Sequence, residues 1–167
     1  MKKKTRLVSG FSLVEVAVAL GIASFCLVTL MALLPVGIQR YHDADAQSAM
    51  VNLATMTVRD LEETPSSGTS PRFGFSIPAA GGTASGTTPQ TVYVDASETP
   101  AGTPGTAPTS SSIYRISVFF SPPGTGQRTA TLARIWITFP ANADPAPGSL
   151  PANYVDMFET TVSLNRN

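Results

Sequence analysis

The chain has 167 residues, enough for one modest domain, and 43% of them are hydrophobic while only 13% are charged. This balance suits a soluble part joined to an apolar anchor. The formal net charge of zero hides an asymmetry, because four of the eleven basic residues are Lys2, Lys3, Lys4 and Arg6. After Gly10, seven scattered arginines stand against eleven acidic residues. Nucleic-acid binding requires clustered basic residues, so we expect no nucleic-acid partner.

A long apolar segment follows the basic leader. Residues 16–34 are 19 consecutive uncharged residues. A helix over residues 11–34 would be about 36 Å long, enough to cross a hydrocarbon core of about 30 Å. Because the basic residues precede this segment, the positive-inside rule places residues 1–10 in the cytoplasm and the chain after Pro35 outside it. The sequence predicts a single-pass inner-membrane protein with a periplasmic C-terminal domain.

Two ordinary explanations of the apolar segment remain open. A secretory signal could be cut at the A-x-A match that ends at Ala46, twelve residues past Leu34, although the apolar part of such signals has only about 7 to 15 residues. An uncleaved signal anchor explains the length and the orientation. Neither explanation accounts for Glu15, since a charge near hydrocarbon costs about 2.5 to 3.5 kcal/mol.

The segment that joins leader and helix reads Gly10-Phe11-Ser12-Leu13-Val14-Glu15. It resembles the cleavage and methylation signature of type IV prepilins and type II secretion pseudopilins. The resemblance implies that a prepilin peptidase cuts between Gly10 and Phe11 and methylates the new amine of Phe11. It also implies that Glu15 pairs with the terminal amine of a sibling pilin or pseudopilin subunit, in an envelope filament built at an inner-membrane assembly platform. The apolar helix would contact membrane lipid before assembly and other helices after it.

A second similarity extends over most of the chain. It rests on the segments LLPVG, YRISVFFSPP and ARIWITFPANADP, which resemble the Verru_Chthon cassette protein B family. Members of that family are prepilin-like proteins of verrucomicrobial bacteria, encoded in multi-pseudopilin cassettes. This resemblance implies a minor, cassette-type subunit rather than a major pilin, and it names no substrate.

Pro35 and Gly37 are expected to break the helix, because proline removes one backbone hydrogen bond and clashes with the preceding turn. The alternative is that Pro35 only marks the membrane exit. Residues 39–62 predict a second helical segment. It is expected to end before residues 65–68, which contain proline and glycine. Its apolar residues recur at intervals of three and four: Met50, Leu53, Ala54, Val58 and Leu61. The charged residues of the segment are expected to point away from the core or to end it: Arg59, Asp60, Glu62 and Glu63.

Short alternating runs follow, separated by glycine and proline. They predict strands at 73–77, 114–120, 135–139 and 158–164, with a weaker candidate at 91–95. Residues 121–126 predict a hairpin loop, and the polar stretches 79–90 and 96–112 predict mobile loops. The expected fold is α+β and pilin-like, a long N-terminal transmembrane helix packed on a small antiparallel sheet. Its segments are a cleaved leader 1–10, an assembly helix 11–34, a kinked second half 35–63 and a β-rich head 64–167.

Residues for catalysis are nearly absent, so we expect no enzyme, no cofactor and no metal. His42 is the single histidine and Cys26, in the apolar segment, the single cysteine, so a Cys/His metal site cannot be assembled. Two acidic pairs could contribute to a calcium site but are more simply solvated loop acids: Asp95 with Glu98, and Asp156 with Glu159. The competing class is a membrane-tethered binding module that never polymerises.

Overall fold

The computed structural model describes residues 12–65, 68–84, 86–127 and 129–164. Its elements are one helix, α1 (Leu13–Glu63), a short 3-10 turn, η1 (Ala141–Ala143), and four strands. The strands are β1 (Gln90–Val94), β2 (Tyr114–Ser121), β3 (Thr131–Phe139) and β4 (Asp156–Leu164). The chain divides into two compact units, Met1–Ala44 and Asp45–Asn167. The predicted α+β class, a long N-terminal helix with an antiparallel sheet, is confirmed.

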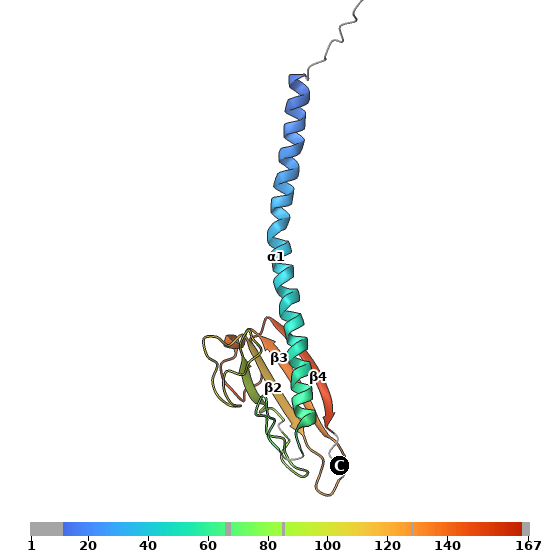
Figure 1. Ribbon diagram of the computed structural model, residues 1–167, viewed down its shortest axis with the longest axis vertical. Coiled ribbons are helices and arrows are strands. Elements are labelled where there is room, and N and C mark those ends of the chain that lie inside the picture. Colours follow the sequence, from blue (N-terminus) through green and yellow to red (C-terminus); the bar gives the residue numbers. More distant parts are fainter. Residues whose placement is uncertain (1–11, 66–67, 85, 128, 165–167) are drawn as a thin grey trace, which may run out of the picture. The chain divides into compact units, whose positions relative to one another are not determined.

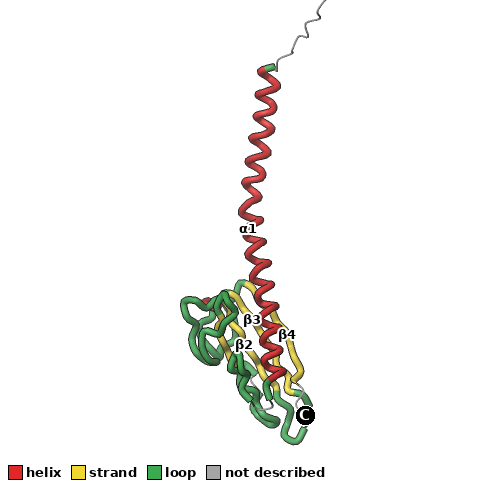
Figure 2. Tube along the Cα trace, in the orientation of Figure 1, coloured by secondary structure: helices red, strands yellow, loops and turns green. Residues whose placement is uncertain are grey.

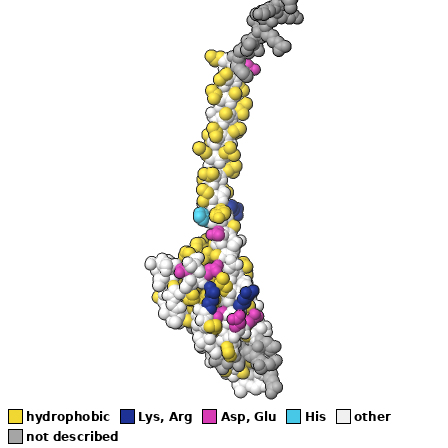
Figure 3. Space-filling view, viewed as in Figure 1, with side chains coloured by type: hydrophobic (Ala, Val, Ile, Leu, Met, Phe, Trp, Pro, Cys, Tyr) yellow, Lys and Arg dark blue, Asp and Glu magenta, His cyan; other side chains and the backbone are white. Residues whose placement is uncertain are grey.

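The first unit contains the apolar part of α1. All of its described residues are exposed, and Figure 3 shows hydrophobic side chains along this stretch. The helix is long and apolar enough to cross a membrane. As expected for hydroxyls inside such a helix, Ser24 Oγ donates to the Leu20 carbonyl at 2.7 Å, and Thr29 Oγ1 donates to the Cys26 carbonyl at 2.8 Å. These bonds satisfy the hydroxyl groups locally.

The expected break at Pro35 and Gly37 does not appear as an unwound stretch. Residues on both sides of Pro35 are helical, and α1 continues without interruption to Glu63. Proline removes only one donor from the helical ladder, and the intact turns before and after it keep the backbone helical. The segment predicted as a separate second helix is therefore the C-terminal part of α1.

The second unit is built on a single four-stranded sheet in the order β1-β2-β3-β4, visible in Figures 1 and 2. Each neighbouring pair is antiparallel. Ser121 pairs with Leu132 at the end of the β2–β3 ladder, so the predicted hairpin across 121–126 is confirmed. The strands predicted at 114–120, 135–139 and 158–164, and the weaker one at 91–95, correspond to β2, β3, β4 and β1.

The core lies between one face of this sheet and the C-terminal part of α1, which crosses the sheet in Figure 1. The helix contributes the buried side chains predicted from its periodicity: Met50, Leu53, Ala54 and Leu61. The strands contribute alternate residues: Val92, Val94, Ile116, Val118, Phe120, Ala133, Ile135 and Ile137. A period of two on the strands and of 3.6 on the helix brings both apolar faces together.

The alternating run at 73–77 is not a strand of the sheet, which corrects one prediction. Phe73, Phe75 and Ile77 are buried in the core, but within the described part of the chain the run forms no ladder and has one isolated bridge, between Thr69 and Ser76. The alternation correctly indicated burial. Pairing requires a free sheet edge as well as an apolar face, and these residues instead cover the core as a loop.

The segment 96–112, predicted as a loop, follows the outer edge of β1. Ala101 N donates to the Tyr93 carbonyl at 2.8 Å, and Gly105 N donates to the Thr91 carbonyl at 3.0 Å. These bonds occupy backbone groups of an edge strand, which otherwise would attract another strand. The loop therefore closes this side of the sheet.

Candidate functional site

The proposed cleavage residues Gly10 and Phe11 lie outside the described residues, so the described chain begins one residue after the expected cut. Ser12 and Glu15 form a capping box at the start of α1. Ser12 N donates to Glu15 Oε2 at 3.1 Å, and Glu15 N donates to Ser12 Oγ at 3.3 Å. Each side chain thereby accepts one of the backbone N–H groups that a helix start leaves unpaired.

This cap gives Glu15 a local role that sequence reasoning missed. The signal was present as Ser-x-x-Glu directly before an apolar run, although the charge of Glu15 beside hydrocarbon is the more conspicuous feature of the same residues. Only one carboxylate oxygen of Glu15 takes part in the cap. Within the described residues the other oxygen, Oε1, has no hydrogen-bond partner, so the carboxylate keeps an acceptor for a second donor.

Gly37 lines an apolar groove on the first unit. Its lining residues are Leu30, Leu33, Leu34, Gly37, Ile38 and Tyr41. A Cβ added at Gly37 would meet no atom within 4 Å. The absence of a side chain there lets another backbone approach closely, as small residues do where helices pack in membranes.

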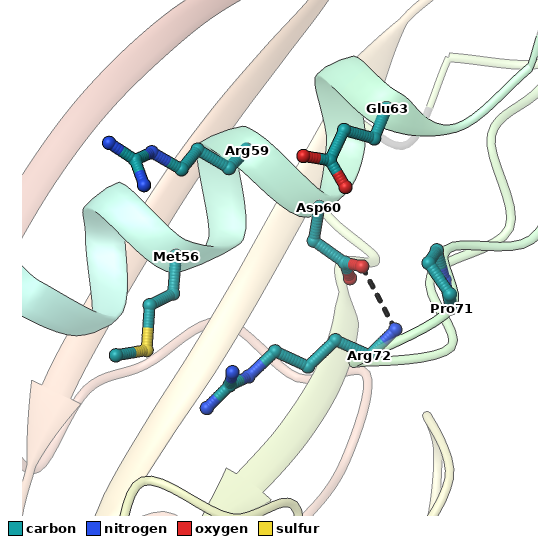
Figure 4. Close-up of a pocket in the computed structure, with 6 residues that line it drawn as sticks. All are labelled: Met56, Arg59, Asp60, Glu63, Pro71 and Arg72. Atoms are coloured by element: carbon teal, nitrogen blue, oxygen red, sulfur yellow. Dashed lines mark hydrogen bonds between the residues drawn. The ribbon is translucent and has the colours of Figure 1, made fainter.

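A second groove, of about 510 Å³, lies in the second unit where α1 meets the loop after it. It is lined by Met56, Arg59, Asp60, Glu63, Pro71 and Arg72, all drawn in Figure 4. The Asp60 carboxylate accepts the backbone N–H of Arg72 at 2.9 Å and that of Phe73 at 3.0 Å. These two bonds fasten the loop to the helix.

The prediction that Asp60 points away from the core is wrong, since only 5% of this residue is exposed. A buried carboxylate persists when hydrogen bonds satisfy it, and here the partners are backbone donors twelve and thirteen residues later. Helical periodicity could not indicate that contact, because nothing in residues 64–73 shows that the loop folds back.

The opposite face of the sheet holds a polar cluster around Arg115, which is fully buried. Its guanidinium donates to the Asp144 carbonyl at 3.1 Å, to the Ser149 carbonyl and to Ser117 Oγ at 3.2 Å. Tyr93 Oη donates to the same Asp144 carbonyl at 2.7 Å. The Asp144 carboxylate in turn accepts the N–H groups of Ala152 and Asn153, both at 3.0 Å.

Burial dominates the electrostatics of this cluster. It lowers the pKa of the Arg115 guanidinium, against the opposing effect of Tyr93 and Asp144, and it raises the pKa of Tyr93. Among the described residues, every hydrogen bond that the Arg115 side chain donates goes to a carbonyl or hydroxyl oxygen. The cluster therefore fastens residues 144–153 to the sheet.

The remaining sequence candidates do not come together into a site. Asp95 Oδ1 accepts the N–H groups of Ser97 and Thr99, at 2.9 and 3.0 Å, which makes it a turn residue. Glu159 lies 4.0 Å from Arg134 in an ion pair. In the part of the chain that the structure describes, no three His, Cys, Asp or Glu residues form a group that could hold a metal ion.

Comparison with family models, with curated proteins and with solved structures found no match to this chain.

Proposed function

We propose that this chain is a minor pilin or pseudopilin-like structural subunit, cut by a prepilin peptidase between Gly10 and Phe11 and anchored in the inner membrane before assembly. One observation supports this most strongly. The helix that begins with the Ser12–Glu15 cap is exposed and apolar in the first unit and then becomes the buried support of a sheet in the second.

An exposed apolar helix requires an apolar environment, because leaving such side chains in water costs about 25 cal/mol per Å². A membrane supplies that environment for a single copy, and the helices of other subunits supply it in a filament. The groove beside Gly37 gives a neighbouring helix a place to approach. The same surface therefore serves both states of the subunit.

Glu15 sets the register between subunits in this proposal. Its second carboxylate oxygen, Oε1, accepts a hydrogen bond from the methylated amine of Phe11 of a neighbour, while Oε2 keeps the helix cap. Losing one partner of a buried ion pair costs about 3 to 5 kcal/mol. In an isolated subunit the unpaired charge near hydrocarbon is therefore unfavourable. In an assembled subunit the same charge makes a specific contact.

The test distinguishes the effect of the helix cap on assembly from the effect of the Glu15 charge. Sibling prepilin-like subunits are recovered by pull-down from detergent extracts at matched expression, using wild type, Glu15→Val, Glu15→Gln and Ser12→Ala. Glutamine preserves a capping box but has no charge, so the proposal expects Glu15→Gln and Glu15→Val to lose partners and Ser12→Ala to keep them. Equal recovery with Glu15→Val and wild type would refute the register role and favour a tethered module that does not polymerise.

Processing is measured separately, by intact mass and N-terminal sequencing of the membrane-bound protein. The expected N-terminus is N-methyl-Phe11 in the wild type and in all three variants, because cutting precedes docking. An N-terminus at Gln47 would indicate release by a signal peptidase, and an intact leader would indicate a plain anchor. A bulky residue in place of Gly10 should leave the precursor uncut.

A further inference from the structure

The groove at the C-terminal end of α1 is lined by two arginine side chains, Arg59 and Arg72. In Figure 4 the guanidinium groups of Arg59 and Arg72 reach toward the Met56 end of the groove, on either side of the Met56 side chain. The Glu63 carboxylate lies nearer to Asp60. The groove therefore has a positive end with an apolar floor and an acidic end.

Arg72 is held in place on both its backbone and its side chain. Its N–H is bonded to Asp60 Oδ1 at 2.9 Å, its Nη2 donates to the Glu98 carbonyl at 3.2 Å, and its guanidinium lies 5.5 Å from the centre of the Phe73 ring. Contacts to a carbonyl and a ring leave the positive charge uncompensated and most of its five N–H donors available. A side chain fixed in this way loses little entropy when it binds.

Arg59 is exposed and has no ion-pair or hydrogen-bond partner among the described residues. The one ion pair in that part of the chain joins Arg134 and Glu159, elsewhere on the sheet. The Asp60 carboxylate does not neutralise Arg59 by contact, because it accepts the two backbone N–H groups of the loop.

We propose that this groove binds a side-chain carboxylate of an acidic peptide segment on a partner protein, held between the guanidinium groups of Arg59 and Arg72. Guanidinium groups match carboxylates with paired N–H donors. The Met56 side chain contacts the methylene groups that carry the carboxylate. The proposal concerns the exported unit alone and does not rest on the pilin-like function.

The charges of the groove select a single carboxylate over a polyanion. Its two arginines are accompanied by two acids, Asp60 and Glu63, so the formal charge of the lining is zero. Protein surfaces that bind nucleic acid or anionic lipid carry an excess of positive charge. This groove has no such excess. A short peptide with one acid beside an apolar residue fits both the guanidinium pair and the Met56 floor.

The experiment uses the full chain in detergent micelles and a fluorescent blocked peptide, acetyl-Ala-Leu-Asp-Ala-Leu-amide, with its Asn counterpart as the control. Binding is followed by anisotropy. The Asp peptide is expected to bind and the Asn peptide to bind at least about tenfold more weakly, because hydrogen bonds to charged groups are the strong ones. Arg59→Gln and Arg72→Gln should each weaken binding of the Asp peptide by about tenfold or more.

Matched variants exclude loss of fold and general charge effects. Arg40→Gln removes an exposed arginine outside the groove and should leave binding unchanged, while Arg72→Lys keeps the charge and should retain part of the affinity. Glu63→Gln should strengthen binding, since it removes a negative charge of the groove lining that repels the peptide carboxylate. The proposal is overturned by an absence of binding, by equal binding of both peptides, by unchanged binding to Arg59→Gln, or by inorganic phosphate displacing the peptide at equal concentration.

Discussion

Replacing Asp60 by alanine should destabilise the second unit more than any other change of a helix carboxylate. The side chain is 5% exposed and accepts two backbone N–H groups, at 2.9 Å from Arg72 and 3.0 Å from Phe73. A hydrogen bond to a charged group contributes about 1.5 to 3 kcal/mol. Water can replace the bond at the exposed Arg72 but not at buried Phe73, so we expect a loss of about 3 kcal/mol in the free energy of unfolding.

The measurement is urea unfolding of the full chain in detergent, followed by the fluorescence of Trp136, the single tryptophan, which lies in β3. With a urea dependence of about 1 to 3 kcal/mol per molar, the midpoint should fall by about 1 to 3 M. Asp60→Asn keeps one acceptor oxygen, so its urea midpoint should lie between those of Asp60→Ala and the wild type. Glu63→Ala, exposed on the next turn, is the control and should change stability by less than about 0.5 kcal/mol. A midpoint for Asp60→Ala equal to that of the control would refute the reasoning.

Three further predictions concern the cap and the polar cluster. Ser12→Ala removes one half of the capping box and should speed amide exchange in the first turn of α1 about fivefold, corresponding to about 1 kcal/mol; unchanged exchange would contradict the cap. Arg115→Met removes three hydrogen bonds together with a buried charge and should cost about 1 to 3 kcal/mol in urea unfolding, whereas a more stable variant would show that burying the charge is the larger cost. Burial raises the pKa of Tyr93, so the folded state keeps its proton where the unfolded state ionises. Stability should therefore be constant below about pH 10 and fall above it, with a smaller fall in Tyr93→Phe; an identical fall in that variant would exclude Tyr93 as the source.

Much of this fold could be read from local patterns. The apolar helix, the periodicity of its second part and the four strands of the sheet all follow from side-chain spacing, since burial on one face imposes a period of 3.6 or of two. The Ser12–Glu15 cap was equally local and could have been predicted from four residues. The cut after Gly10 and the role of Glu15 in assembly stay predictions from the motif.

Contacts between distant segments were decided only by the tertiary structure. Asp60 is buried because a loop twelve residues later folds back onto it, and Arg115 is buried because residues 144–149 cover its face of the sheet. Phe73 and Phe75 alternate like a strand but cover the core as a loop. Residue spacing indicates which side chains share a face, whereas the burial of a polar group depends on which remote backbone donors and acceptors reach it. That pairing is set when helix, sheet and loops pack together.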